Sequence, residues 1–139
     1  MVRRDLEQEI LPICRENSVS VLSYSSLALG LLSGKIGPNR SFTGDDLRKG
    51  NPRFSEHNRQ KIANLMQAVR PIAEDHHASE AQVVIAWTLS QPGITFSLCG
   101  ARNPEQAREN AGAGRIRLSA NDIAAIDAAA VKHLSKLDS

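Results

Sequence analysis

Apolar side chains recur along this chain at two different spacings, which predict a mainly helical fold with about two short strands. Several segments carry them three and four positions apart, the spacing of one helix face. These segments are residues 6–14, 58–76, 79–91 and 119–131. Residues 19–22 and 94–98 are instead rich in β-branched and aromatic residues, which favour strands. Around residues 79–91 the apolar positions wrap widely, so we expect this helix to be buried on more than one side.

A long polar stretch separates the first predicted strand from the helix that follows it. Residues 33–51 are rich in Gly, Asn, Asp, Ser and charged residues, and Pro38 and Pro52 break any regular pattern. We therefore expect a flexible loop over 33–51. The residues after Val131 are expected to fray.

The segment that joins the second strand to its helix is the most informative part of the chain. It begins at Gly100, and Asn103 followed by Pro104 is typical of a capped helix start. Such a start presents free N–H groups and the positive end of the helix dipole, which together suit a phosphate. Arg102 adds a guanidinium group beside them. The segment therefore predicts an anion site at the end of the strand.

Three polar side chains follow on the same helix. Gln106, Glu109 and Asn110 are three to four positions apart along the helix, so they project from one side near its start. The base and ribose of a nucleotide could lie against them. The same spacing also fits a capped surface helix after a buried strand, and the pattern alone leaves both interpretations open.

Three blocks of residues resemble one enzyme family. Residues 100–110, GARNPEQAREN, resemble the last strand-to-helix signature of the aldo-keto reductases. Residues 21–35, VLSYSSLALGLLSGK, are similar to the family's seventh-strand segment, usually Tyr-Ser-Pro-Leu-Ala and then Gly-Leu-Leu-x-Gly-Lys. A third block continues the match in order, with PRF at 52–54, AQVVIAW at 81–87 and QPG at 91–93. The resemblance covers nearly the whole chain.

The resemblance implies an α/β fold, the C-terminal fragment of a (β/α)8 TIM barrel. Such barrels need about 250 residues, whereas this chain has 139. Residues 1–139 are therefore interpreted as a single partial domain with strands seven and eight and the closing helices. The Tyr, Asp, Lys and His that transfer protons in this family come from earlier strands, and no segment here matches their motifs. No catalytic residue is assigned, and the chain alone is expected to be inactive.

By the same resemblance, the chain binds a nicotinamide cofactor, with a preference for NADP (NADPH). Tyr24 would stack on the nicotinamide, Lys35 and Arg48 would reach over the phosphates, and Arg102 would contact the adenosine 2′-phosphate. The implied cofactor-binding residues are Tyr24, Ser25, Ser26, Leu27, Ala28, Leu29, Lys35, Arg48, Gly100, Arg102, Gln106, Glu109 and Asn110.

Two residues of the block at 21–35 need a further comment, because one has an alternative interpretation and the other departs from the family pattern. On structural grounds alone, Tyr24 after a strand fits a packing residue with a solvated hydroxyl. Ser26 stands where the family commonly has proline, and this departure is expected to loosen the turn.

Composition narrows the remaining classes of function. Hydrophobic residues make up 41% of the chain and charged residues 23%, with a net charge of +2, which favours neither nucleic acid nor an anionic membrane as partner. The chain has no long apolar run and no signal-like start, so a cytoplasmic location is expected. Cys14 and Cys99 are interpreted as reduced core residues, and no metal site is predicted, because His76 and His77 are adjacent and point apart on a helix.

The two predicted strands lack the neighbours that a barrel would give them. Their uncovered edges and the apolar helix faces predict a homo-oligomer or association with a missing N-terminal part. Three functions remain open at this point: the cofactor-binding part of an NADP-dependent reductase of aldehydes or ketones, a non-catalytic nucleotide-binding or interaction module, and an oligomerising fragment without a competent site.

Overall fold

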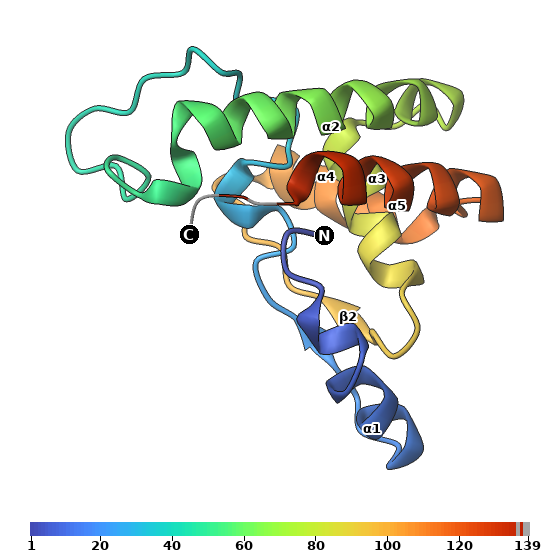
Figure 1. Ribbon diagram of the computed structural model, residues 1–139. Helices are drawn as coiled ribbons and strands as arrows, with labels where there is room; N and C mark the ends of the chain where they lie inside the picture. The colour runs from blue at the N-terminus through green and yellow to red at the C-terminus, as the bar shows by residue number, and fades with distance from the viewer. Residues whose placement is uncertain (136, 138–139) are drawn as a thin grey trace.

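Helices dominate the computed structural model of the chain, which describes residues 1–135 and 137. Figure 1 shows the longest helix, α2, beside α5. The α-helices are α1 (Ile10–Glu16), α2 (Glu56–Asp75), α3 (Glu80–Ser90), α4 (Pro104–Gly112) and α5 (Ala120–Leu134). Short 3-10 turns are η1 (Asp5–Glu7), η2 (Ala28–Gly30), η3 (Pro52–Phe54) and η4 (Ala113–Arg115). The chain was expected to fray after Val131, but helix α5 continues to Leu134. Residues 136, 138 and 139, to which the same expectation applied, lie outside the described residues.

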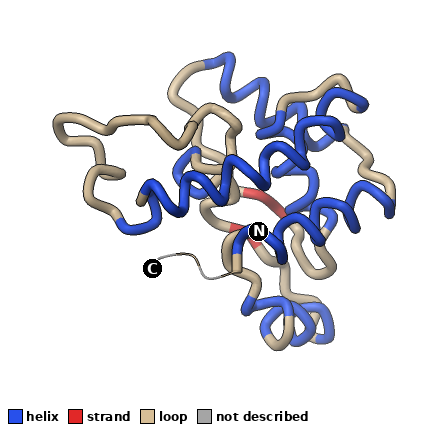
Figure 2. Tube along the Cα trace, turned by 45° about the horizontal axis from the view of Figure 1, so that its top comes forward, coloured by secondary structure: helices blue, strands red, loops and turns tan. Residues whose placement is uncertain are grey.

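The two strands are adjacent and parallel, with two helices between them in the chain (Figure 2). Strand β1 (Leu22–Ser23) pairs with β2 (Phe96–Ser97), so that Leu22 lies opposite Phe96 and Ser23 opposite Ser97. Both strands are shorter than the sequence predicts. A pair without neighbours on either edge has few ladder hydrogen bonds to extend it.

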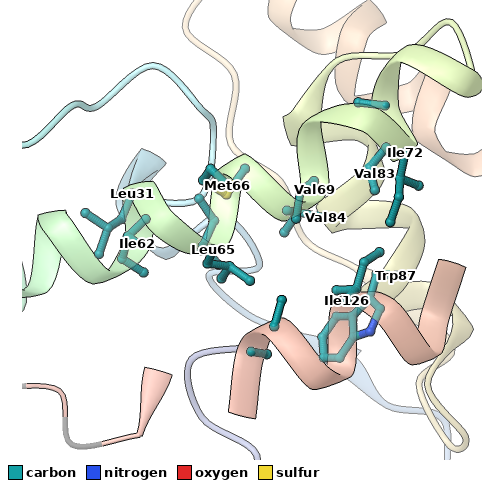
Figure 3. Close-up of a cluster of buried hydrophobic side chains, with 14 of the residues drawn as sticks. Leu31, Ile62, Leu65, Met66, Val69, Ile72, Val83, Val84, Trp87 and Ile126 are labelled. Atoms are coloured by element: carbon teal, nitrogen blue, oxygen red, sulfur yellow. The ribbon is translucent and has the colours of Figure 1, made fainter. Parts of the chain in front are cut away.

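The hydrophobic core lies where α2, α3 and α5 meet (Figure 3). Trp87 of α3 is 1% exposed, and Ile126 of α5 and Val69 of α2 are fully buried beside it. Helix α3 buries consecutive residues, from Val83 to Thr88, so it is buried on more than one side as predicted. Ser79 and Ser119 begin α3 and α5, each with a capping box that closes the first turn.

The first helical segment departs from its predicted packing. Leu11 is buried, but Ile10 and Ile13 are 56% and 57% exposed, because the described residues cover only one narrow side of α1. Cys14 and Cys99 are free thiols, as predicted, although both are half-buried rather than core residues.

The loop over residues 33–51 has no helix or strand, as its composition predicts. It is nevertheless attached to the helical core at several points, and Ile36 is buried within the core itself. The Phe42 ring meets Phe54 edge-on at 5.4 Å between ring centroids, and Arg59 of α2 donates a hydrogen bond to the Arg40 carbonyl at 2.8 Å. The flexibility of the rest of the loop stays a prediction.

Candidate functional site

The start of α4 has the predicted cap. The Asn103 side chain accepts a hydrogen bond from the Gln106 backbone N–H at 2.9 Å, and Pro104 occupies the first turn. The Gln106 side-chain carbonyl in turn accepts from the Arg102 backbone N–H at 2.9 Å. These two contacts hold Arg102 beside the helix start, as an anion site requires.

The same helix is joined to the end of β2. The Asn110 side-chain amide donates to the Gly100 carbonyl at 3.1 Å, so two residues predicted for the site meet directly. This contact fixes the turn from strand to helix and uses one donor of Asn110, which leaves the amide's other donor for a ligand.

Two further predicted residues form a pair with one another. Lys35 Nζ lies 3.4 Å from Glu109 Oε2, and the Ser79 hydroxyl donates to Glu109 Oε1 at 2.6 Å. The Ser79 hydrogen bond and the charge of Lys35 lower the pKa of Glu109. Glu109 therefore connects α4 to the cap of α3 and to the loop, and its carboxylate is already paired in this structure.

Arg48, predicted to reach over phosphates, is paired with a carboxylate that the sequence analysis did not assign. Arg48 Nε donates to Asp46 Oδ1 at 2.8 Å, and the guanidinium stacks 4.7 Å from the Phe42 ring centroid. Hydrogen bonds from the Arg48 side chain and backbone lower the pKa of Asp46 to about 2, and the charge of Arg102 contributes in the same direction. The two residues are only two positions apart, so the sequence pattern Asp-x-Arg at 46–48 could have indicated this ion pair.

Arg102 differs from the other two cations. Its side chain is exposed, and within the described part of the chain its guanidinium has no hydrogen-bond or ion-pair partner. A guanidinium beside a capped helix start fits a phosphate group. Arg102 is thus the cation of the predicted set that is free to bind an anion.

The segment that follows β1 exposes its tyrosine and holds an unusual backbone. Tyr24 is 85% exposed, so the interpretation of a packing residue is wrong, and its ring is accessible to a ligand. Ser25, Ala28 and Leu29 have positive φ angles of 59°, 48° and 56°. Residues other than glycine adopt this region at a cost of about 1–3 kcal/mol each, so other contacts must hold this segment in place.

Ser26 supplies such contacts, and the expected loosening of the turn stays a prediction. Its hydroxyl accepts a hydrogen bond from Ser97 at 2.7 Å and lies 2.9 Å from the Ser23 hydroxyl. Ser26 therefore connects the loop after β1 to the neighbouring strand β2.

The predicted residues fall into two groups that the structure places against different surfaces. The residues after β1, including Tyr24 and Leu29, line a cavity of about 860 Å³ that Met1, Leu11 and Trp87 also line. Gly100, Arg102, Gln106 and Glu109 do not line it, and Asn110 lines a smaller cavity of about 400 Å³ beside β2. The group after β1 and the group around α4 are joined through the contact of Ser26 with Ser97.

Other classes of site find no support in the described residues. No group of three or more His, Cys, Asp and Glu side chains in that part of the chain could hold a metal ion. No helix among the residues described is long and apolar enough to cross a membrane.

Comparison with known proteins places the chain in one enzyme family. The model of the aldo/keto reductase family matches residues 1–131, and the chain belongs to this family. Enzymes of the family are oxidoreductases that use nicotinamide cofactors and act on carbonyl compounds.

Individual relatives cover most of this chain but only part of their own length. A probable aldo-keto reductase from Glycine max is 33% identical over 120 residues, which are 86% of this chain and 34% of that protein. The NADH-specific methylglyoxal reductase of Escherichia coli is 34% identical over 119 residues, 86% of this chain and 36% of that enzyme. The chain thus spans about a third of the length of these curated relatives.

A solved structure agrees with the predicted fold. The glycerol dehydrogenase of Gluconobacter oxydans superposes with a TM-score of 0.86 at 30% identity, over 96% of this chain and 41% of that enzyme. The chain therefore has the architecture of part of an aldo-keto reductase TIM barrel, which confirms the fold predicted from the sequence.

Proposed function

We propose that this chain is the cofactor-binding part of an NADP-dependent aldo-keto reductase whose complete barrel reduces aldehydes or ketones. The observation that supports this most directly is the unpaired Arg102 guanidinium beside the capped start of α4. A 2′-phosphate distinguishes NADP from NAD, and a guanidinium is the side chain that best matches a phosphate in geometry and charge. The accessible Tyr24 ring is a second feature that suits a dinucleotide.

Different residues of the chain would bind different parts of the cofactor. Arg102 binds the 2′-phosphate, and the free amide donors of Gln106 and Asn110 hold the adenine end. Tyr24 stacks on the nicotinamide, which supplies a hydride to the carbonyl carbon when it is bound. Reduction also needs a proton donor placed at the carbonyl oxygen. None of the residues assigned here has that role, so we propose that the chain alone does not turn over.

The carboxylate of Asp46 is a feature that would favour NADH over NADPH. Its carboxylate is paired with Arg48 and is affected by the charge of Arg102, so it would repel an added phosphate if the pair opened. The relative from Escherichia coli is named for its specificity for NADH. A preference for NADH is therefore the outcome that the test below must distinguish from the proposed one.

We also propose that the isolated chain self-associates. Leu22 and Phe96, paired across the two strands, are 52% and 55% exposed, and Leu98 is 48% exposed. In a complete barrel, further strands would cover this surface. In isolation, a second copy of the chain can bury the same side chains and pair the open strand edges. A cytoplasmic location is proposed from the ordinary balance of hydrophobic and charged residues.

Titration of NADPH and NADH tests the cofactor assignment, both in the chain and after its transfer into a complete aldo-keto reductase barrel. Arg102→Ala should weaken NADPH binding about ten- to more than a hundredfold and leave NADH binding nearly unchanged, because an Arg–phosphate contact is worth about 1.5–3 kcal/mol. Arg108→Ala is the matched control, since Arg108 also lies on α4, its side chain is 78% exposed, and its ion pair among the described residues is with Glu105. Equal binding of both cofactors, or an unchanged preference in Arg102→Ala, would overturn the assignment.

A further inference from the structure

The cavity of about 860 Å³ beside Tyr24 is lined by more positive than negative charge. Within the described part of the chain, the charged side chains along its wall are those of Arg3, Glu7 and Arg53. The Glu7 carboxylate is already neutralised, because both of its oxygens accept a hydrogen bond from Arg4 at 2.8 Å. Two guanidinium groups therefore remain for a ligand in this cavity.

Arg53 is held at the cavity by its neighbours around the short turn η3. The Asn51 side chain accepts a hydrogen bond from the Arg53 backbone N–H at 3.0 Å, and Asn58, which is 1% exposed, donates to the Pro52 carbonyl at 3.1 Å. Phe54, the next residue, is buried in the core. Arg53 itself is exposed, and its guanidinium has no hydrogen-bond or ion-pair partner among the residues that the structure describes. Its backbone is thus fixed while its charge is unused.

Arg3 is a second cation at the same cavity, and its charge is weakly held. Arg3 Nη2 lies 3.0 Å from Asp5 Oδ2, and the two side chains are 69% and 65% exposed. An ion pair so exposed contributes little, so a ligand anion can compete with Asp5 for the guanidinium. The neighbouring Arg4 anchors the backbone at this point, because its guanidinium stacks 5.2 Å from the Trp87 ring centroid.

The rest of the cavity wall is mostly apolar and suits a small organic ligand. Leu22, Leu29, Leu31 and Phe54 line it together with Tyr24. Binding sites for small molecules are typically concave, of about 300–1,000 Å³, and mainly apolar with a few polar groups that fix the orientation of the ligand. Tyr24 is the ring proposed to stack on the nicotinamide, so a carbonyl compound that is to be reduced would lie in this cavity.

We propose that Arg53, assisted by Arg3, binds an anionic group of the carbonyl substrate, so that the complete barrel prefers carbonyl compounds that carry a carboxylate or a phosphate. The inference rests on the proposed function, since it takes the cavity beside Tyr24 as the place of the carbonyl. A guanidinium can bind either anion through two parallel hydrogen bonds. The anionic group stays unchanged in the reaction, while the carbonyl carbon gains a hydride from the bound cofactor and the carbonyl oxygen gains a proton from the acid of the complete barrel.

Steady-state kinetics of a chimera tests this preference. In the chimera, residues 1–139 replace the matching part of a complete aldo-keto reductase, and the substrates are para-formylbenzoate and its neutral amide, para-formylbenzamide. Arg53→Gln should raise the KM of the anion about tenfold, the lower end for a hydrogen bond to a charged group because the site is open to water. The KM of the amide should stay nearly unchanged. Arg3→Gln should have a smaller effect on the anion, about two- to fivefold.

Two further variants and a second pair of substrates define the site. Arg53→Lys keeps the positive charge and should retain most of the preference for the anion. Arg108→Ala removes an exposed cation that does not line the cavity, and it should leave the preference unchanged. An effect of Arg53→Gln that appears with glyceraldehyde phosphate, compared with glyceraldehyde, and not with para-formylbenzoate would identify phosphate as the anionic group.

A second measurement uses the chain as it is. Benzoate or benzamide is titrated against the whole chain, and the Nε–H signals of its arginines are followed by nuclear magnetic resonance. The signals of Arg53 and Arg3 should move with benzoate and not with benzamide, and the signal of Arg108 should move with neither. Movement of equal size at Arg108 and Arg53 would show a general effect of salt and overturn the assignment.

The two measurements separate this inference from the proposed function. A chimera that consumes no NADPH with any of these aldehydes contradicts the proposed function, and the titration of the whole chain then decides the anion site by itself. A chimera that reduces the aldehydes, but whose ratio of KM values for each anion and its neutral partner is the same in the wild type and in Arg53→Gln, agrees with the proposed function and overturns the inference.

Discussion

Arg48 holds the Asp46 carboxylate at two points, with Nε 2.8 Å from Oδ1 and Nη2 2.5 Å from Oδ2, while its guanidinium stacks on Phe42. This arrangement pairs a cation predicted for phosphate binding with an internal anion. A ligand phosphate would have to displace the carboxylate to use Arg48. On the proposed assignment, the pair therefore competes with the cofactor phosphates for Arg48, and the nearby charge of Arg102 lowers the pKa of the same Asp46 carboxylate.

Removal of the Asp46 charge should strengthen the binding of NADPH. Asp46→Asn releases Arg48 and removes a negative charge near Arg102, so we expect about two- to fivefold tighter NADPH binding, a modest effect because exposed ion pairs are individually weak. NADH binding should change less. The measurement is a titration at low ionic strength, and Asp45→Asn, which removes the neighbouring exposed carboxylate, is the control. Tightening of the same size in both variants would show a general effect of charge.

The isolated chain should show no NADPH-dependent reduction of a reactive aldehyde. Proton transfer needs a positioned acid, and Tyr24, the sole tyrosine of the chain, is 85% exposed and has no assigned partner to activate it. The assay follows NADPH oxidation by absorbance, with a complete aldo-keto reductase as the positive control. Turnover by the purified chain that disappears in Tyr24→Phe would contradict this expectation.

The chain should form dimers or larger assemblies through the strand surface. Phe96 and Leu22 are opposite one another and about half exposed, so Phe96→Lys should lower the average molar mass measured by light scattering over a concentration series. Leu47→Lys is the matched control, because Leu47 is 86% exposed in the long loop. A wild-type chain that stays monomeric at all concentrations would be inconsistent with this prediction.

Stability should fall in acid through the pair of His76 and Asp122. The hydrogen bond with His76, at 3.1 Å, is the main cause that lowers the pKa of Asp122, and the Ser119 backbone N–H adds to it. Because this pKa is lower in the folded chain, the stabilisation is complete above the ordinary aspartate pKa of about 4 and is lost as the pH falls through the folded value.

Asp122→Asn tests this pH dependence by thermal unfolding between pH 2 and 7. The variant should be less stable near pH 6 by about 0.5–1 kcal/mol, and the difference should shrink below about pH 4. Asp75→Asn, which changes an exposed carboxylate at the end of α2, should not show this loss. Identical melting temperatures of wild type and Asp122→Asn near pH 6 would rule out the proposed contribution.

Local features of the fold were predictable because their partners are close in sequence. Ser79, Asn103 and Ser119 each accept from a backbone N–H three residues later, and all three helix starts lie where the sequence predicts them. The ion pair of Asp46 with Arg48 could also have been predicted, because the two residues are two positions apart, but the sequence analysis did not identify it. The exposure of Ile10 and Ile13 was not predictable, because helical spacing identifies a potential packing face and does not show what lies against it.

The sequence by itself determined the family, the helix starts, and the two strands whose ends carry the candidate site. The tertiary structure decided which of the site residues meet. The contacts of Ser26 with Ser97 and of Lys35 with Glu109 join residues 71 and 74 positions apart. They exist because α2 and α3 return the chain so that β2 lies parallel to β1. Such distant pairs depend on the packing of whole helices, which no local pattern of residues specifies.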